Sequence, residues 1–307
     1  MKVLVTGGAG YVGIPLSHLL LEAGHEVVVY DNLVWGVDGV LPLFRSPRFT
    51  LVEGDVLDAG KLRKAITGAD AVIHLAAIVG QPACDKAAAA AYQVNTQGTK
   101  NVVDALSPRQ IYLFASTGSV YGRIGNICTE DTPLNPQSLY GTTKAEAEKI
   151  SLNAGGVAYR FPTAFGFAPR LRLDLLPNDF LYQAMWHGFI LLYQPGARRT
   201  FMHVNDIGRS YLFGLERFEA LRGKVYNVGN ESLNLTKKEL AEIVNEITPF
   251  RLYIVEGKED ADQRDYFVDY SRIRGLGFTL TVGIREGLVE LERAIRFIRP
   301  QGRYRNF

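Results

Sequence analysis

The chain opens with MKVLVTGGAGYVG, residues 1–13, and this stretch decides the fold. Residues 2–6 form a short apolar run rich in β-branched side chains, which is typical of a buried parallel strand. Glycines then recur at every third position from Gly7 to Gly13, and an apolar helical pattern follows. Such glycines permit a tight turn and let backbone N–H groups approach a pyrophosphate at the helix N-terminus. The stretch therefore predicts a dinucleotide site whose turn supplies Gly7, Gly10, Tyr11 and Val12.

A second apolar run, residues 26–30, leads to Asp31 and Asn32. Asp31 lies 18 positions after the last glycine of the turn (31 − 13 = 18), near the spacing expected of an acid that binds the adenosine ribose. A carboxylate there accepts hydrogen bonds from the ribose hydroxyls and repels a 2′-phosphate. We therefore predict NAD rather than NADP as the cofactor, with Asp31 and Asn32 beside it. The alternative is an aspartate that only begins a loop.

Two further runs, residues 49–53 and 71–74, predict the next strands. Asp55 follows the first run, and it either bonds the adenine amino group or caps the helix that begins near residue 57. His74 ends the second run and is interpreted as a packing residue. The small residues after it let a cofactor lie against the backbone. The predicted cofactor residues of this edge are Asp55, Val56, Leu75, Ala76 and Ala77.

A helix is expected over residues 82–106, with Cys84 in the loop before it, facing the substrate cleft. The next strand, residues 111–115, is followed by a turn rich in hydroxyl groups, from Ser116 to Ser119. Hydroxyls at the carboxyl end of a strand point into the crevice where doubly wound sheets bind ligands. A hydroxyl there can bond both a substrate oxygen and Tyr140. The alternative is a hydroxyl-rich turn without a chemical role.

The stretch YGTTK, residues 140–144, begins a predicted helix, because a proline and a serine precede a run of good helix formers. Tyr140 and Lys144 are four positions apart and so share one face of that helix. An ammonium near a phenol favours the phenolate and lowers the phenol pKa, so the tyrosine can accept or return a proton at neutral pH. Taken alone, such a pair is more often a surface tyrosine and lysine. The dinucleotide signals elsewhere favour the catalytic interpretation.

The composition is that of a globular protein and argues against some other classes. Of 307 residues, 47% are hydrophobic and 21% are charged, as in ordinary globular proteins. The net charge of +2 argues against a nucleic-acid protein with a broad basic face. Cys84 and Cys128 suggest neither a disulfide framework nor a metal site, which suits a reducing compartment. With no signal peptide and no long apolar stretch in the sequence, we expect a cytoplasmic protein that binds no membrane.

These motifs, taken in order, resemble the extended short-chain dehydrogenase/reductase family, in its NAD-dependent epimerase/dehydratase group acting on nucleotide sugars. The resemblance rests on TGGAGYVG, DN, GDV, HLAA, STGSVYG, YGTTK and RTFMHVNDI and covers nearly the whole chain. It implies an α/β fold, a Rossmann-type doubly wound parallel sheet with a smaller α+β substrate-binding lobe, and a homodimer. The implied NAD-binding lobe comprises residues 1–165 with 200–230, and the nucleotide-sugar lobe comprises residues 166–199 with 231–307.

By this resemblance, Tyr140 is the catalytic base, and Lys144 holds the nicotinamide ribose and lowers the tyrosine pKa. Thr117 lies where the family keeps its catalytic serine or threonine. One departure concerns the next two positions. Family 4,6-dehydratases carry an Asp-Glu pair there, as acid and base for removing water, whereas this chain has Gly118 and Ser119. Dehydration is therefore disfavoured.

The same resemblance implies further contacts with the cofactor and with the substrate. Ser116 falls at a supporting position beside the catalytic threonine, and Asn95 falls near the active-site helix. Pro162 would border the nicotinamide, and Thr163 the phosphates of the sugar nucleotide.

Beyond Thr163 the alternation of strands and helices breaks down, and a loop punctuated by glycine and proline begins the substrate lobe. Guanidinium groups suit a diphosphate, although an arginine in a loop is ordinarily exposed, so Arg170 and Arg172 remain open at this point. A helix is expected to begin near Asp179. Family positions that contact the sugar nucleotide complete the substrate-binding set, which is Thr117, Thr163, Arg172, Asn178, Arg199 and Arg264.

Residues 199–206 are expected to form a strand that returns to the dinucleotide lobe, with Asn205 capping the helix after it. His203 and Asp206 are interpreted as residues of local structure. Thr236 is a candidate cap for a later helix, residues 235–247.

The resulting hypothesis is reversible oxidation at C4 of a nucleotide-diphosphate sugar, as in UDP-glucose 4-epimerases, by way of a 4-keto intermediate. Residues 168–178 and 264–266 are also similar to a surface-polysaccharide subgroup that includes GDP-heptose 4-dehydrogenases. A 4-dehydrogenase or a 4-keto reductase without epimerisation is therefore the alternative. A non-catalytic NAD-binding protein is the alternative from another class.

Overall fold

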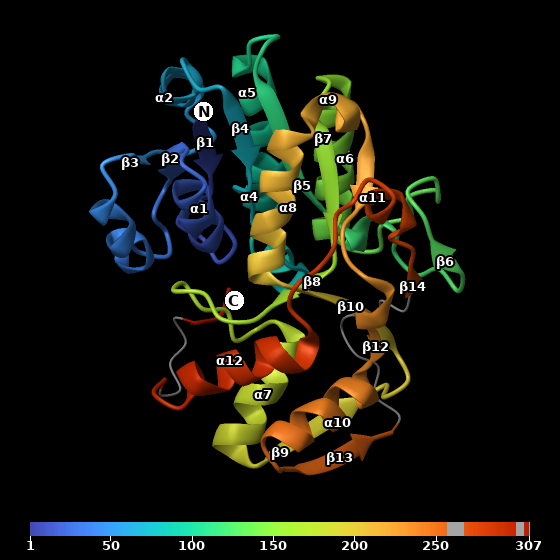
Figure 1. Ribbon diagram of the computed structural model, residues 1–307. Coiled ribbons are helices and arrows are strands. Elements are labelled where there is room, and N and C mark those ends of the chain that lie inside the picture. The colour runs from blue at the N-terminus through green and yellow to red at the C-terminus, as the bar shows by residue number, and fades with distance from the viewer. Residues whose placement is uncertain (257–266, 299–303, 307) are drawn as a thin grey trace.

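The computed structural model describes residues 1–256, 267–298 and 304–306. It has a larger part built on a seven-stranded sheet and a smaller part of helices and short sheets (Figure 1).

The seven strands of the larger sheet are all parallel and lie in the order β11-β7-β5-β4-β1-β2-β3. Because the direction of winding reverses between β1 and β4, a crevice opens there at the carboxyl ends of the strands. The predicted doubly wound α/β fold is confirmed. The strands are β1 (Lys2–Thr6), β2 (Glu26–Asp31), β3 (Phe49–Glu53), β4 (Ala71–His74), β5 (Ile111–Thr117), β7 (Val157–Phe161) and β11 (Val225–Asn227).

Helices cover both faces of this sheet, which explains the unbroken apolar runs of its strands. Val3 and Val5 of β1 pack in one core with α1 (Gly13–Glu22) and α8 (Val204–Glu216). Leu4, between them, points to the opposite core, which α2 (Ala59–Ile66), α5 (Gly98–Ala105) and α6 (Leu139–Asn153) cover. Both cores exclude water from the sheet, so the functional side chains gather at its carboxyl edge.

The smaller part has an apolar core of its own, which includes Leu181, Phe201 and Leu288. In its three-stranded sheet, β10 pairs parallel with β8 and antiparallel with β12. A second small sheet pairs β9 with β13 in parallel. These elements are β8 (Thr163–Phe165), β9 (Phe189–Tyr193), β10 (Arg198–His203), β12 (Asn234–Thr236), β13 (Arg251–Val255), α7 (Leu176–His187), α10 (Lys237–Ile247) and α12 (Ile284–Ile295).

Short elements connect the two parts. β6 (Ile127–Cys128) pairs with β14 (Phe267–Val268), and Ile273 of α11 (Ser271–Arg274) packs in the core of the larger part. The lobe limits predicted from the sequence remain a prediction. The remaining short helices and turns are α9 (Phe218–Leu221), Asp38–Arg45, Gly118–Val120 and Glu231–Leu233.

The helix expected over residues 82–106 is broken, and that expectation was wrong. It consists of α3 (Gln81–Lys86), α4 (Ala88–Tyr92), a π-helical turn at Gln93–Gln97 and then α5. Ala87 interrupts it with a non-helical backbone, φ −134° and ψ 53°. Cys84 therefore lies within a helix rather than in a loop, and it is fully buried, with its thiol donating to the carbonyl of Ile78.

Two other local expectations need correction, and one is confirmed. The helix expected near Asp179 begins three residues earlier, at Leu176. The cap of α8 is His203 rather than Asn205, because the Asn205 N–H donates to the His203 ring. Thr236 does cap α10, and it forms a reciprocal capping box with Glu239.

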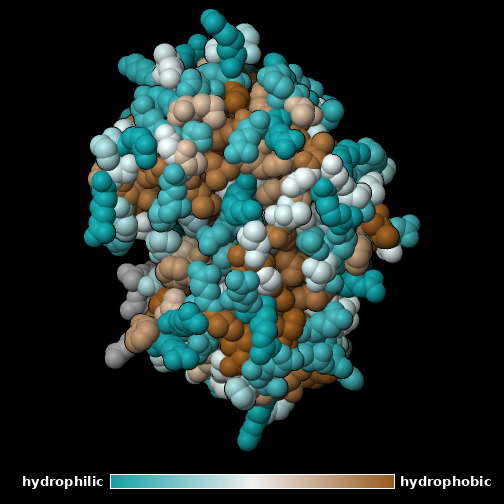
Figure 2. All heavy atoms as spheres, in the orientation of Figure 1, coloured by the Kyte–Doolittle hydropathy of each residue, from teal (hydrophilic) through white to brown (hydrophobic). Residues whose placement is uncertain are grey.

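Figure 2 shows hydrophilic side chains over most of the face turned to the viewer, with apolar atoms showing between them. In the part of the chain that the structure describes, no helix has the length and apolar character needed to cross a membrane. The same residues contain no cluster of histidine, cysteine or carboxylate groups that could hold a metal ion.

Asp206 joins the start of α8 to the segment that precedes α12. Its fully buried carboxylate accepts hydrogen bonds from the N–H groups of Thr281 and Val282 and from the Thr281 hydroxyl, and it pairs with Arg209. This carboxylate thereby ties the helix of the larger part to the last helix of the smaller part.

We expect Asp206→Asn to lower the free energy of unfolding by about 2–3 kcal/mol, because an amide nitrogen would then face buried N–H donors. Urea denaturation of the purified protein measures this loss. Glu216→Gln, at the exposed end of the same helix, is the control and should cost less than about 0.5 kcal/mol. Equal losses in the two variants would contradict the role given to Asp206.

Candidate active site

A cavity of about 780 Å³ lies at the carboxyl edge of the large sheet and is lined by residues of both parts. Its wall combines the glycine turn after β1, the acidic end of β2, the hydroxyl end of β5 and the first turns of α6. Of the predicted site residues, the structure brings these to the wall: Gly7, Gly10, Tyr11, Val12, Asp31, Asn32, Asp55, Val56, Leu75, Ala76, Ala77, Ser116, Thr117, Tyr140, Lys144, Pro162, Thr163 and Arg172.

The glycine turn packs so closely against neighbouring backbone that a side chain would not fit. Gly7 has a left-handed backbone, φ +69°, and a Cβ there would lie 2.6 Å from the backbone nitrogen of Ala76. A Cβ on Gly10 would lie 3.1 Å from the Gly7 carbonyl oxygen. The backbone between them thus presents a cradle at the N-terminus of α1, which fits a pyrophosphate.

The end of β2 forms the acidic wall of the cavity. The Asp31 carboxylate accepts hydrogen bonds from the N–H groups of Ala9, at 3.0 Å, and Leu33, at 2.8 Å. Burial raises the pKa of Asp31, and these two N–H bonds oppose that shift. The carboxylate is therefore held rigidly beside the glycine turn, where a ribose would lie.

Asp55 lies at the same end of the cavity. It accepts from Asn32 at 3.1 Å and from the Leu57 N–H at 2.9 Å. The cap of α2 is a different residue, Asp58, which accepts from the Lys61 N–H. Helix capping therefore does not explain the position of Asp55.

The first turns of α6 present Tyr140 and Lys144 to the cavity. Ser138 caps this helix by accepting from the Gly141 N–H at 3.1 Å. Lys144 is only 3% exposed, and its ammonium lies 4.1 Å from the centre of the Phe114 ring. Burial lowers the pKa of Lys144 to about 7, although Glu148 opposes this shift. The cavity wall therefore holds a lysine that gives up its proton more readily than an exposed lysine does.

The end of β5 supplies two hydroxyls to the same wall. The Thr117 hydroxyl oxygen accepts from the Ser119 N–H at 3.2 Å. The Ser116 hydroxyl donates to Glu148 at 2.5 Å. Each hydroxyl is thus held in one orientation by a neighbouring group.

Asn95 and Asn178, both predicted at ligands, lie behind the wall rather than on it. Asn95 lies in the π-helical turn. Its side chain accepts from the Ile78 N–H and donates to the Ile78 carbonyl and to the Thr143 hydroxyl. Asn178 is fully buried and bonds the Gly166 N–H and the Arg172 carbonyl. In the described chain, therefore, each braces a segment of the cavity wall.

The predicted arginines have different surroundings. Arg172 lines the cavity and pairs with Asp174 at 2.5 Å. Arg199 is 2% exposed in β10, does not line the cavity and donates to the carbonyl of Arg198. Arg264 lies outside the described residues.

Sequence reasoning missed part of the rim. Trp35 lines the cavity with its ring stacked against Arg170, at 4.2 Å, and Arg170 donates to Asn306 at 2.7 Å. Arg170 carried a sequence signal as a loop arginine, but Trp35 and Asn306 carried none. These three residues are far apart in the sequence, and only the tertiary structure brings them together.

Comparison with known proteins identifies the family of this chain. A model of the NAD dependent epimerase/dehydratase family matches residues 3–229. The chain belongs to this family. It is therefore an NAD-dependent enzyme, and the glycine cradle and Asp31 fit that cofactor.

Relatives and solved structures within the family span several reactions. The chain is 32% identical to a dTDP-glucose 4,6-dehydratase of Streptomyces griseus, over 93% of this chain and 91% of that protein. It is 28% identical to a UDP-glucose 4-epimerase of Corynebacterium glutamicum, over 81% and 80%. The structure of DesIV, a dTDP-glucose 4,6-dehydratase of Streptomyces venezuelae with NAD bound, matches with a TM-score of 0.85 and 27% identity, over 96% and 97%.

A UDP-glucuronic acid 4-epimerase of Bacillus cereus has a similar fold, with a TM-score of 0.87 at 24% identity, over 96% of this chain and 99% of that one. Epimerases and dehydratases thus share this fold.

We expect Gly7→Ala to cost about 3 kcal/mol or more of stability and to weaken NAD binding about tenfold or more, because the new Cβ meets the Ala76 backbone. Gly68→Ala is the matched control, since Gly68 also has a positive φ, +82°, but open space around it. It should cost only about 1 kcal/mol. Urea denaturation and NAD titration measure the two effects. If both variants bind NAD as the unaltered protein does, the cradle is not the cofactor site.

We also expect Lys144→Met to stabilise the protein by about 2–4 kcal/mol near pH 6 while abolishing activity, because it removes a buried charge. Lys144 has an ordinary pKa of 10.5 when unfolded and about 7 when folded. Between these values the unfolded chain binds more protons, so the stability of the unaltered protein rises with pH. The advantage of the variant should therefore shrink as the pH rises, and thermal unfolding across this range measures it. A constant difference would contradict the assignment.

Proposed function

We propose that this enzyme oxidises C4 of a nucleotide-diphosphate sugar to a 4-keto intermediate and then reduces it from the other side, which makes it a 4-epimerase. The observation that carries the proposal is the meeting of Thr117, Tyr140 and Lys144 on the wall of one cavity that also holds the glycine cradle.

Each of these side chains has a separate task in the proposal. Tyr140 takes the proton of the 4-hydroxyl and returns it after the sugar has turned. Thr117 holds the same oxygen, and the charge of Lys144 favours the phenolate form of Tyr140. NAD, when bound, supplies the hydride acceptor. The remaining roles in cofactor and substrate binding are proposed as the family resemblance implies them.

The carboxylates of the cavity support epimerisation over dehydration. Among the described residues that line it, these carboxylates are Asp31 and Asp55, which lie at the ends of β2 and β3. Gly118 and Ser119 follow Thr117, so the described wall has no acid beside the catalytic threonine. Removal of water across C5 and C6 needs an acid and a base at that place. We therefore place this chain apart from its dehydratase relatives in its reaction.

We propose a 4-dehydrogenase or 4-keto reductase as the second candidate, on the resemblance that the sequence of residues 168–178 suggests to the GDP-heptose subgroup. The three catalytic side chains serve these reactions equally well. The outcome depends on how freely the keto intermediate turns before the hydride returns.

The test incubates the purified enzyme and NAD with UDP-, GDP-, dTDP- and CDP-sugars and follows NADH absorbance and sugar chromatography. A new 4-epimer without net NADH is the expected result. Accumulating NADH with a keto product would instead identify a dehydrogenase. An intermediate lacking the elements of water would overturn the argument from Gly118 and Ser119.

With the substrate in hand, Tyr140→Phe should lower kcat by about 100- to 10,000-fold, because the ring keeps its shape but cannot carry the proton. Tyr253→Phe, on the exposed edge of β13, is the matched control and should leave kcat unchanged. NAD titration shows whether the cofactor site is intact in both. Unchanged turnover in Tyr140→Phe would contradict the role of proton carrier given to Tyr140.

A further inference from the structure

A carboxylate that does not line the cavity lies directly behind the proposed catalytic pair. Glu148 follows Lys144 by four residues on α6, so the two share one helix face. Both are 3% exposed. A buried carboxylate is costly to maintain unless other groups compensate its charge, so its partners indicate what it does.

The partners of Glu148 come from two strands. Ser116 of β5 donates its hydroxyl proton to one carboxylate oxygen, at 2.5 Å. Arg160 of β7 binds both oxygens with two parallel hydrogen bonds, at 2.6 and 3.0 Å. Because the Ser116 proton is committed to Glu148, the hydroxyl can only accept hydrogen bonds from the cavity side.

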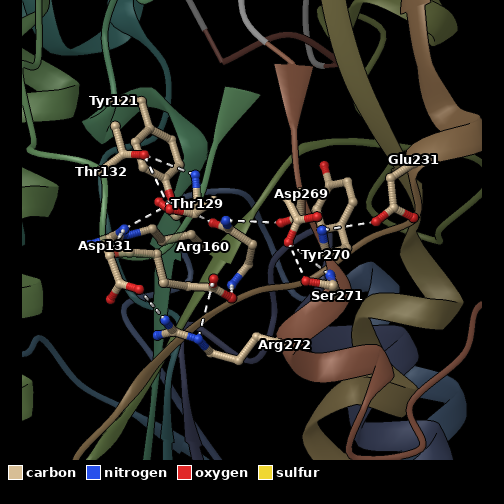
Figure 3. A network of polar contacts seen from close by, with 12 residues as sticks. Tyr121, Thr129, Asp131, Thr132, Arg160, Glu231, Asp269, Tyr270, Ser271 and Arg272 are labelled. Atoms are coloured by element: carbon tan, nitrogen blue, oxygen red, sulfur yellow. Dashed lines mark hydrogen bonds and ion pairs between the residues drawn. The ribbon is translucent and has the colours of Figure 1, made fainter. Parts of the chain in front are cut away.

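Arg160 is itself fixed from the opposite side (Figure 3). Its guanidinium donates to the Tyr121 hydroxyl, at 2.9 Å, and to the carbonyl of Glu130, at 3.2 Å. Tyr121 in turn donates to Asn227 of β11, at 2.7 Å. Every link is buried, so Arg160 cannot swing away and Glu148 keeps its orientation.

Among the ionisable groups around Lys144, Glu148 is the one whose negative charge can stabilise the ammonium. In the described chain, the ionisable groups that face Lys144 are Cys84 of α3, His74 of β4, and Tyr140 and Glu148 of α6. Burial raises the pKa of Cys84 to about 11 and lowers the pKa of His74 to about 3, so both are neutral near pH 7. The positive charge of Arg160 lies beyond the carboxylate.

We propose that Glu148 is a positioning residue of the reaction, which orients the Ser116 hydroxyl at the cavity wall and supplies a negative charge that favours the cationic form of Lys144 beside Tyr140. This inference rests on the proposed roles of Tyr140 and Lys144. It adds a residue outside the cavity, and it gives the buried pair with Arg160 a purpose beyond stability.

The decisive variant is Glu148→Gln, which keeps the size of the side chain and removes its charge. Lys144 should then lose its proton about one pH unit lower, so the high-pH limb of the kcat profile moves down by that amount. Between about pH 6 and 7 the variant has lost the Lys144 ammonium that the unaltered protein still holds, so less Tyr140 phenolate, followed by ultraviolet difference absorbance against Tyr140→Phe, should form in that range. A purely structural role would change stability and leave both titrations where they are.

Glu146→Gln is the matched control, since it makes the same change two residues earlier on α6, on a different helix face. It should leave the kcat profile and the phenolate titration unmoved. If Glu148→Gln does not fold because it strands the Arg160 charge, the double variant Glu148→Gln with Arg160→Gln removes that charge. The double variant should show the same downward shift of the high-pH limb.

The phenolate titration needs no substrate, so it separates two failures. If no nucleotide sugar is turned over but less phenolate forms in that pH range in Glu148→Gln, the proposed function fails and the role of Glu148 stands. If a folded Glu148→Gln variant or the double variant leaves both titrations unchanged, the inference is overturned.

Discussion

The structure around the cavity depends on one constraint, which is that a lysine ammonium buried in its wall needs neighbours that stabilise its charge. Removing Lys144 from water disfavours its charge by several kcal/mol, so its neighbours must recover part of that cost. The Phe114 ring faces the ammonium, and Glu148 lies one helical turn away. Two strands, β5 and β7, then hold that carboxylate in place. These contacts together stabilise a positive charge at the cavity wall while shielding it from solvent.

A single helix organises this chemistry. α6 begins at a serine cap and places Tyr140, Lys144 and Glu148 at intervals of four, so one face carries a phenol, an ammonium and a carboxylate in sequence. The parallel sheet brings the other participants to the same edge, because all its strands end there. The smaller part closes the cavity with loop residues such as Arg172.

Local signals made much of this predictable. Each of these signals can be read from a few neighbouring residues, and the residues that carry them all reach the cavity wall. They are the glycine turn, Asp31, the hydroxyls after β5 and the tyrosine–lysine spacing. Asn95 and Asn178 show where such reasoning ends, because both are buried behind the wall by contacts that no short stretch reveals. The kinked helix before α5 was missed for a similar reason, since its helix-favouring alanines give no sign of the break at Ala87.

The rim formed by Trp35, Arg170 and Asn306 has a practical consequence for anyone who handles this protein. Asn306 lines the cavity, so an affinity tag joined to the chain close to this residue would lie beside it. Met1 instead precedes the amino end of β1, and the five residues of this strand separate it from the glycine turn by about 16 Å. A tag joined at Met1 therefore leaves the cavity accessible, and the two attachment sites are not equivalent.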